Sequence, residues 1–587
     1  MLHDKPSHPP TEAISPLHYG LLAGLLLLGV ALRFWHLDLK PLWMDEVITA
    51  IFGMGRSYAE VPVQQFFGFS ELSQLFTVQP GQSCGAIAQR VSVDSVHPPL
   101  FFCLLYAWMS WLQPLTSNWV WLLRAFPALC GVGAIAALYA LNRIAFSPRA
   151  GLVAAGLMAV SPFAVYLSQE ARHYTLPMLL ISLGLVGLVL LQQDLQTRQF
   201  RAWAWMGWIG VNVLGLYVHY FFLLALVAQI AALVGWLGWS RDRFRLGWLM
   251  LGLAIATIFL AYLPWLRLML SHVSRPETDW LSLSPGLGAR LAPIVQGLAG
   301  WIITIILLPV EEQPLAIAIP LGLVMIAFAG WVAWLAIRGL RRLWYATHNP
   351  ALPLLLGFTA TLLLEFLAII YLLGKDLTLA PRYNFVYYPG MCALLGAALT
   401  WVPHRKTRAI APILLPKKLR FPLTKHNLSF AERVQFTVIL LGLLSSIFVV
   451  NGYGFYKSFN PDRVAANLLQ NASAPISLAI STRSPQEIAL GLSFGLGLQR
   501  AKPSHPVQVA FIPRTNADYQ TVWATLATLL QSQPRPLNLW VVGNPDLRQA
   551  TYPSTLTLQN ATCTADPNRY YRTLSVPYQG YPCINRN

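Results

Sequence analysis

The stretch Leu17–Trp35, LHYGLLAGLLLLGVALRFW, is followed almost at once by LKPLWMDEVITA, Leu39–Ala50. The first stretch contains no acidic residue and is long enough to cross a bilayer, for which a helix needs about 20 apolar residues. The second stretch places two adjacent carboxylates, Asp45 and Glu46, where that membrane helix should end. Because acids are scarce in this chain, the pair is the first candidate for a functional site at the membrane rim.

The composition predicts a polytopic α-helical membrane protein. Of 587 residues, 56% are hydrophobic and 11% are charged, whereas soluble domains average about 25% charged residues. The formal net charge of +18 could suggest nucleic acid as a partner. However, the Lys and Arg residues form short clusters between apolar runs, where signals for membrane orientation belong. We therefore expect no nucleic-acid partner.

The basic clusters also decide which apolar runs cross the membrane. If His97–Gln113 crossed, Arg143 and Arg149 would lie on the opposite side from the basic loop 403–433, against the positive-inside rule. The conflict disappears if His97–Gln113 and the run at about 291–309 stay at the outer surface. The sequence then predicts about eleven transmembrane helices. The N-terminus is inside, and the external loop 37–118 carries juxtamembrane helices.

The composition of the chain becomes polar after the last apolar run. Residues 1–457 are expected to form the transmembrane domain, and 458–587 are polar and rich in Pro and Asn. Three strand-like runs (PISLAIS, VQVAFIP, LNLWVVG) alternate there with two helix-like ones (SPQEIALGLSFGLGL, YQTVWATLATLLQSQ). This alternation predicts a small extracytoplasmic α/β domain. Cys563 and Cys583 share it, so one disulfide is possible in an oxidising compartment. The other four cysteines are interpreted as packing residues, except Cys84 in a loop.

Several short outer turns carry polar groups that could join Asp45. Each has a structural alternative: Asp45 could cap a surface helix, Glu170 could simply pair with Arg172, and Arg382 could snorkel to the interface. Ionisable groups at membrane depth are nevertheless costly, and usually paired or functional. The candidates from these turns are His97, Glu170, Arg172, Tyr174, His219, Lys375, Arg382 and Tyr383.

This set of side chains fits group transfer from a lipid-linked phosphate. A carboxylate can accept the proton of an attacking hydroxyl as a general base. Cations can neutralise the charge that develops on a departing phosphate. A lipid tail on the donor explains why such a site should lie at the membrane rim, which a soluble substrate would not require.

Four motifs together resemble the GT-C glycosyltransferases. The group concerned is that around family 39, which contains the protein O-mannosyltransferases, the lipid A aminoarabinose transferases and the RgtA/B/C/D-like bacterial enzymes. The motifs are WMDE after the first span, HPP at the second apolar segment, YLSQEARHY after a short span and PRY before a late span. The resemblance covers roughly residues 15–400, and it is the ordered set rather than any one motif that is specific.

The resemblance implies a role for each matching residue. Asp45 becomes the catalytic base or acceptor-orienting group, with Glu46 beside it. Glu170 becomes a second acidic group, although many relatives have Asp there. His97 matches a position that contacts donor phosphate or occasionally a metal, and Arg382 with Tyr383 matches a basic position near that phosphate. Arg172 and Lys375 would support the same charge. The family uses a polyprenyl- or dolichyl-phosphate sugar and inverts the anomeric centre.

Some points stay open at the level of sequence. A divalent metal ion is possible, although there is no dedicated metal motif, and the acceptor could be a cell-envelope lipid, glycan or protein. A bacterial inner membrane, with the site outside, is the preferred location. The main alternative function is a transporter or flippase of lipid-linked saccharides, and a non-catalytic scaffold is a further one. Transporters usually place paired charges near the midplane, where this chain has Glu365, which we expect to meet a partner inside the bundle.

Overall fold

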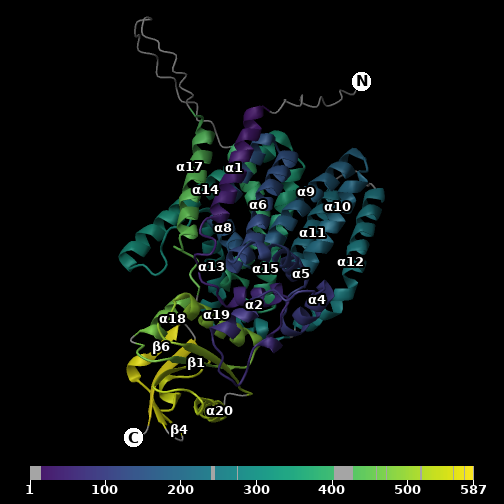
Figure 1. The fold of residues 1–587 in the computed structure, drawn as a ribbon. Coiled ribbons are helices and arrows are strands. Elements are labelled where there is room, and N and C mark those ends of the chain that lie inside the picture. The colour runs from purple at the N-terminus through teal and green to yellow at the C-terminus, as the bar shows by residue number, and fades with distance from the viewer. Residues whose placement is uncertain are drawn as a thin grey trace, which may run out of the picture.

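Helices dominate the chain up to residue 469, and the strands follow from residue 476 onward (Figure 1). The computed structural model describes residues 15–239, 245–273, 275–401, 428–457, 459–470, 472–515, 519–558, 561–573 and 576–585. Most of the basic loop 403–433 lies outside these ranges. The expected fold class, a polytopic helical membrane protein with a C-terminal sheet domain, is confirmed.

Nine helices in the described part of the chain are long and apolar enough to cross a membrane. A tenth span results if α7 and α8, which meet at a bend of 59°, are counted as one. The candidates are α1 (Pro16–Phe34), α6 (Trp119–Ala145), α7 (Pro148–Val160) with α8 (Pro162–Ser168), α9 (Thr175–Thr197), α11 (Phe222–Trp239), α12 (Arg245–Val273), α13 (Leu287–Ile305), α14 (Leu315–Thr347), α15 (Ala351–Leu372) and α17 (Phe430–Val450).

This count differs from the predicted eleven because helix lengths differ from the apolar runs. α10 (Ala202–Val218) and α16 (Tyr388–Thr400) have 17 and 13 residues, fewer than the about 20 of a typical span. α5 (Leu100–Leu112) has 13 residues, which fits its expected place at the surface. α13, expected at the surface too, has 19 residues and meets the length criterion. It packs against α8 and two short helices, η4 (Leu377–Leu379) and η5 (Pro381–Val386).

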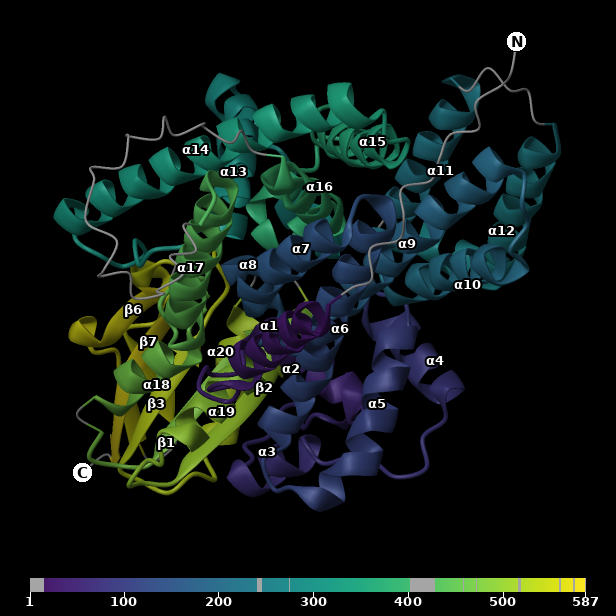
Figure 2. The same cartoon turned by 90° about the horizontal axis from the view of Figure 1, so that it is seen from above.

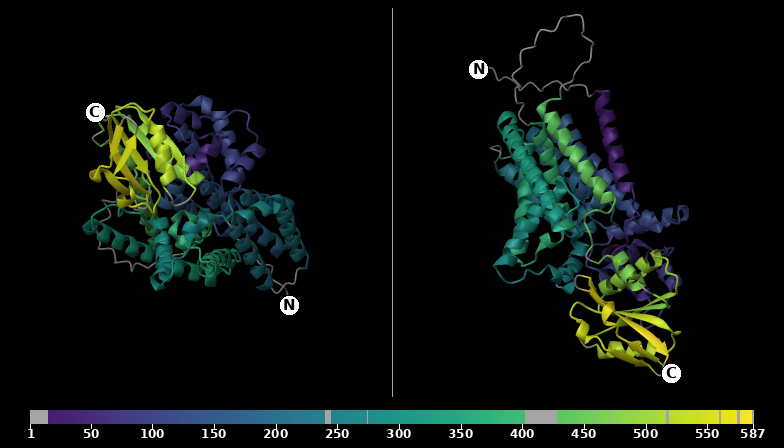
Figure 3. Two further views of the ribbon diagram at one scale, coloured as in Figure 1. Left: turned by 90° about the horizontal axis from the view of Figure 1, so that it is seen from below. Right: turned by 90° about the vertical axis from the view of Figure 1, so that its left-hand side faces the viewer.

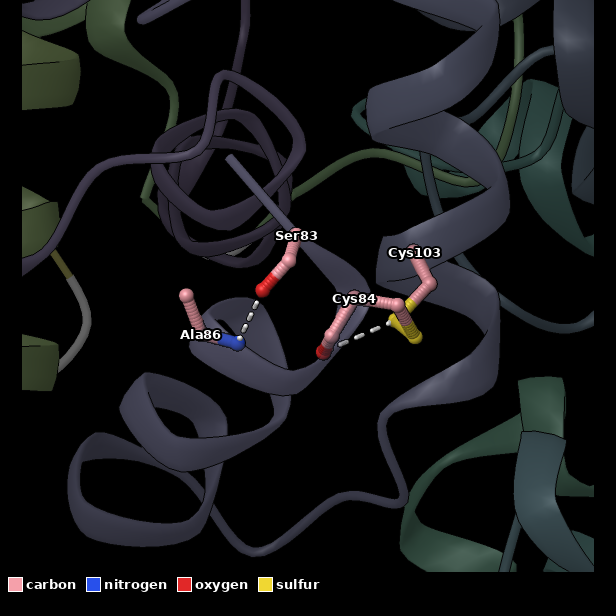
Figure 4. The surroundings of a disulfide bond; sticks show 4 residues. All are labelled: Ser83, Cys84, Ala86 and Cys103. Atoms are coloured by element: carbon pink, nitrogen blue, oxygen red, sulfur yellow. Dashed lines mark hydrogen bonds between the residues drawn. A yellow bond between two sulfur atoms is a disulfide. The ribbon is translucent and has the colours of Figure 1, made fainter. Parts of the chain in front are cut away.

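The segment between α1 and α6 folds as a cluster of short helices at one end of the bundle (Figure 3). A disulfide between Cys84 and Cys103 fastens one of these helices to α5 (Figure 4). The sequence analysis missed this bond, because Cys103 lies in an apolar run that looks like packing. The helices are α2 (Met44–Gly53), η1 (Tyr58–Glu60), α3 (Phe69–Leu75), α4 (Cys84–Asp94), α5 and η2 (Gln113–Leu115).

The C-terminal domain contains one mixed sheet with the strand order β2-β1-β3-β7-β5-β4, and β6 pairs with β7. β1 is parallel to β2 and β3, whereas β7 is antiparallel to β3. The three predicted strands and two predicted helices are present, and the antiparallel strands were not foreseen. The elements are α18 (Pro461–Leu469), β1 (Ile476–Thr482), α19 (Pro485–Arg500), β2 (Val507–Pro513), α20 (Gln520–Leu530), β3 (Leu537–Val542), η7 (Gln549–Thr551), β4 (Thr555–Leu558), β5 (Ala561–Thr564), η8 (Pro567–Arg569), β6 (Tyr570–Thr573) and β7 (Val576–Asn585).

The two faces of this sheet belong to different cores. Leu478 and Ile480 of β1 join the core that continues into the helical bundle, while Ala479 joins a second core beneath α20. This split follows from the two-residue period of a strand. The disulfide between Cys563 and Cys583 joins β5 to β7, as the sequence allowed.

Contacts with the loop between α1 and α6 fix the C-terminal domain in place. α19 packs against α2, and the loop extends the sheet beyond β2. Gln64 N donates to Phe511 O at 2.8 Å, and Phe67 and Val509 exchange two backbone hydrogen bonds. Seen along the bundle, the sheet domain lies beside the helices of this loop (Figures 2 and 3). Two of the predicted acids, Glu46 and Glu170, line a cavity at this junction.

Candidate active site

Asp45 and Glu46 occupy the first turn of α2, and Trp43 rather than Asp45 takes its N-cap position. Carboxylates are favourable there because the unpaired backbone N–H groups give a helix N-terminus a partial positive charge. Although the two acids are neighbours, their environments differ. The side chain of Glu46 is 1% exposed and that of Asp45 is 11% exposed.

Glu46 forms a buried, bidentate ion pair with Arg124 of α6. Arg124 Nε donates to Glu46 Oε1 at 2.8 Å and Arg124 Nη2 donates to Oε2 at 2.7 Å. The backbone N–H of Ala171 adds a third bond to Oε1 at 2.8 Å. Arg124 also donates to the carbonyl oxygens of Leu37, Lys40 and Pro41. Glu46 therefore holds together α2, α6 and the turn before α9, and both of its oxygens are engaged.

Asp45 faces two guanidinium groups that come from distant parts of the chain. Arg382 Nη2 lies 3.5 Å and Arg172 Nη2 lies 3.9 Å from Asp45 Oδ2. Both distances exceed the usual 2.7–2.9 Å of a charged hydrogen bond. Arg172 is held instead by the backbone oxygen of Asp45 and by Thr49 Oγ1, at 2.9 and 3.0 Å. The Asp45 carboxylate is thus loosely paired, although its side chain is largely buried.

Aromatic rings enclose the Arg382 guanidinium. Its Cζ lies 5.3 Å from the ring centroid of Trp43, 5.7 Å from that of Tyr383 and 5.8 Å from that of Trp280. Such rings stabilise a cation and keep it oriented. The ring of Tyr174 stabilises Arg172 in the same way, with its centroid 5.7 Å from Arg172 Cζ. The predicted Tyr174 and Tyr383 thus lie beside the two arginines.

Glu170 has a partner that the sequence analysis did not find. Lys457, in the linker after α17, forms an ion pair with Glu170 and donates to Tyr166 Oη at 2.6 Å. Burial lowers the pKa of Lys457, while the Glu170 carboxylate opposes this shift. The linker to the C-terminal domain thus contributes a charge to the site. A single Lys in a polar linker gives no signal in the sequence.

The predicted His97 and His219 lie on either side of a third histidine, His173. The ring centroids are 4.5 Å apart for His97 and His173, and 4.7 Å apart for His173 and His219. Burial, reinforced by the positive charge of Arg172, lowers the pKa of all three histidines well below 6.5. The cluster is therefore neutral at pH 7. His173 is part of the SQEARHY motif but was passed over in favour of its charged neighbours.

The predicted Lys375 makes its contacts with the segment that carries Trp280. Its ammonium donates to Asp279 Oδ1 at 3.1 Å and to Ser282 Oγ at 3.2 Å. Asp279 precedes Trp280, one of the rings around Arg382. Lys375 thus supports the segment that carries Trp280.

The described residues contain no group of three His, Cys, Asp or Glu side chains arranged to hold a metal ion. His97 and His173 meet edge to face instead of converging on one point.

Glu365 of α15, which was expected to find a partner inside the bundle, has two carboxylate oxygens without a hydrogen-bond partner among the described residues.

Comparisons with known proteins agree with this architecture. Residues 96–265 match the sequence model of the dolichyl-phosphate-mannose-protein mannosyltransferase family. ArnT from Cupriavidus metallidurans is similar in structure, with TM-scores of 0.52 for its apo state and 0.51 for its complex with undecaprenyl phosphate. In both cases the identity is 13%, and 96% of this chain and 98% of ArnT are covered.

The archaeal oligosaccharyltransferase AglB from Archaeoglobus fulgidus matches with a TM-score of 0.45 at 14% identity, over 92% of this chain and 70% of that one. No curated protein matches the chain by sequence.

The chain is therefore a multi-pass membrane protein whose fold is similar to that of ArnT. Residues 96–265, less than half of the chain, are similar to the dolichyl-phosphate-mannose-protein mannosyltransferase family. The matched region contains His97, Arg124 and the SQEARHY turn, whereas Asp45 and Arg382 lie outside it.

The Glu46–Arg124 pair generates a prediction about stability. Glu46→Gln removes the charge that balances a buried guanidinium, and breaking such a pair costs about 3–5 kcal/mol. We expect a lower thermal unfolding temperature and a lower yield of folded protein in detergent. A Glu46→Gln protein that unfolds like the wild type but has lost activity would instead make Glu46 a catalytic group.

The buried histidines predict an acid-sensitive fold. Their pKa values lie well below 6.5 in the folded protein, so below about pH 6.5 the unfolded chain binds more protons than the folded one. Stability should therefore fall as the pH falls from 7.5 to 5.5. His173→Phe should reduce this dependence, measured as the difference between unfolding temperatures at the two pH values. An unchanged difference would contradict the prediction.

Proposed function

We propose that this enzyme moves a sugar from a polyprenyl-phosphate-linked donor to an acceptor hydroxyl on the extracytoplasmic face, with inversion at the anomeric carbon. One observation carries the proposal: the loosely paired carboxylate of Asp45 faces Arg382 and Arg172 at one end of the bundle. This arrangement combines a proton acceptor with two cations for a phosphate. The acceptor is a cell-envelope lipid, glycan or protein, and we favour a bacterial envelope glycan or lipid.

In the proposed reaction Asp45 orients the acceptor hydroxyl and takes its proton. The acceptor oxygen attacks the anomeric carbon as the bond between that carbon and the phosphate oxygen breaks. The electron pair leaves with the phosphate, and the negative charge that develops there is balanced by Arg382 and Arg172. His97, His219 and Tyr383 lie beside these groups as contacts for the donor. Glu46 positions Asp45 through its bonds to Arg124.

The distribution of basic residues and disulfides between the two ends of the bundle supports an extracytoplasmic site. Arg143, Arg149 and Arg198 lie at the ends of α6, α7 and α9 that are remote from Asp45, and basic residues favour the cytoplasmic side. Both disulfides belong to the parts at the end of Asp45, the external loop and the C-terminal sheet, and disulfides persist in oxidising compartments. We accordingly propose residues 1–457 as the transmembrane domain and 458–587 as an extracytoplasmic one.

A lipid-linked donor is supported by the likeness to ArnT, which has been solved bound to undecaprenyl phosphate. The matched family is described by its use of dolichyl-phosphate mannose. The donor phosphate lies at Arg382 in our proposal, at the end of the bundle where a lipid chain can remain among the helices.

Asp45→Asn tests the general base. The substitution keeps the size of the side chain but removes the proton acceptor, so transfer of labelled sugar from polyprenyl-phosphate donors in liposomes should fall by about 10²–10⁴-fold. Asp38→Asn, at an exposed acid of the same loop, is the matched control and should keep its activity. A wild-type protein that neither transfers nor hydrolyses any donor, but flips lipid-linked saccharides, would favour the transporter.

Arg382→Gln tests the phosphate contact. If the guanidinium balances charge that develops during the reaction, its loss should lower kcat by about 10²–10³-fold. Arg290→Gln, at an exposed arginine of α13, serves as the control. A raised KM with unchanged kcat would show instead that Arg382 acts in the binding of the donor alone.

A further inference from the structure

A cavity of about 360 Å³ lies where the external loop, the end of α8, the linker after α17 and α19 meet. We call it the junction cavity. Its walls include parts of both proposed domains, and the ion pair of Lys457 with Glu170 is on one side of it. The basic and acidic residues that line it are Lys40, Arg124, Lys457, Arg500, Glu46, Glu170 and Asp462.

The residues that line this cavity carry a net positive charge, because four of them are basic and three are acidic. Three of the basic side chains have acidic partners in the cavity wall: Arg124 with Glu46, Lys457 with Glu170, and Arg500 with Asp462. The ammonium group of Lys40 forms no hydrogen bond or ion pair with any residue in the described part of the chain. One positive charge is therefore left over, and a half-buried charge without a partner is costly.

The remaining wall is partly aromatic. Tyr166 and Phe455 stack with ring centroids 4.0 Å apart, and Trp43 lines the same cavity. The indole Nε1–H of Trp43 is buried and has no acceptor among the described residues. Buried polar groups are normally hydrogen-bonded, so such a donor beside a cavity needs an explanation. Aromatic walls with a few polar groups are what ligand sites offer.

Trp43 connects the junction cavity with the reaction centre. Its ring centroid lies 5.3 Å from Arg382 Cζ and 4.2 Å from Lys457 Nζ. Arg382 faces Asp45, whereas Lys457 lines the cavity. The cavity extends from this indole toward Arg500 and Asp462 of the C-terminal domain. A donor lipid must stay with the helices of the bundle, so the cavity is placed for the other substrate.

We propose that the junction cavity binds a negatively charged group of the acceptor, a carboxylate or phosphate, through the ammonium of Lys40. The acceptor of this enzyme is then an anionic glycan or glycolipid, with its charged group near the hydroxyl that is glycosylated. This inference rests on the proposed function, because it names the acceptor class for the same reaction. Lys40 acts as a residue that determines specificity.

The experiment compares two matched probes, p-nitrophenyl β-glucuronide and p-nitrophenyl β-glucoside, which differ in one carboxylate. Their binding to the full-length protein in nanodiscs is measured by calorimetry. The wild type should bind the glucuronide about 10–100-fold more tightly, the value of one hydrogen bond to a charged group. Lys40→Gln should remove this preference and Lys40→Arg should keep it. Lys502→Gln, at an exposed lysine of the C-terminal domain, should also keep it.

Equal binding of both probes to the wild type, or a preference that survives Lys40→Gln, would overturn the inference. So would complete displacement of the glucuronide by inorganic phosphate at equal concentration, since the cavity would then be a site for free anions. Release of polyprenyl phosphate from the donor, measured on the same samples, separates the two proposals. Donor cleavage without anion preference refutes the acceptor class alone, whereas anion preference without donor cleavage refutes the proposed function.

Discussion

The bidentate pair between Arg124 and Glu46 is the constraint on which the arrangement of the site depends. It is fully buried, and it ties α6, the start of α2 and the turn before α9 to one point. Removing either partner would leave an isolated charge in a low-dielectric interior. With Glu46 fixed, its neighbour Asp45 is presented to the opposite side, toward Arg172 and Arg382. In the proposed reaction, one acid of the pair is thus used for positioning, and the other takes part in the chemistry.

The difference in hydrogen bonding between Glu46 and Asp45 explains why two adjacent carboxylates can differ in function. Glu46 accepts hydrogen bonds on both oxygens, so it has no free lone pair that is well placed for a substrate. Asp45 has two cations nearby at distances that leave room for rearrangement. In our proposal, these two guanidinium groups and the loosely held carboxylate receive the donor phosphate and the acceptor hydroxyl together.

The C-terminal domain is part of the site's construction. Its linker supplies Lys457 to Glu170, its α19 packs on α2, and its sheet is extended by the external loop. These contacts join segments that are several hundred residues apart in sequence. A substitution in the C-terminal domain can therefore act on the reaction centre through α2, without touching a substrate.

The sequence by itself determined the membrane-embedded helical class, the change to a sheet domain, the side chains of the outer turns and the resemblance to the GT-C enzymes. These depend on local composition and on short motifs. Only the tertiary structure decided that Glu46 pairs with Arg124 and Glu170 with Lys457, that His173 joins His97 and His219, and that Cys84 bonds to Cys103. Each of these is a contact between distant segments. Hydrophobic periodicity reports which residues are buried but carries no information about which buried residue meets which.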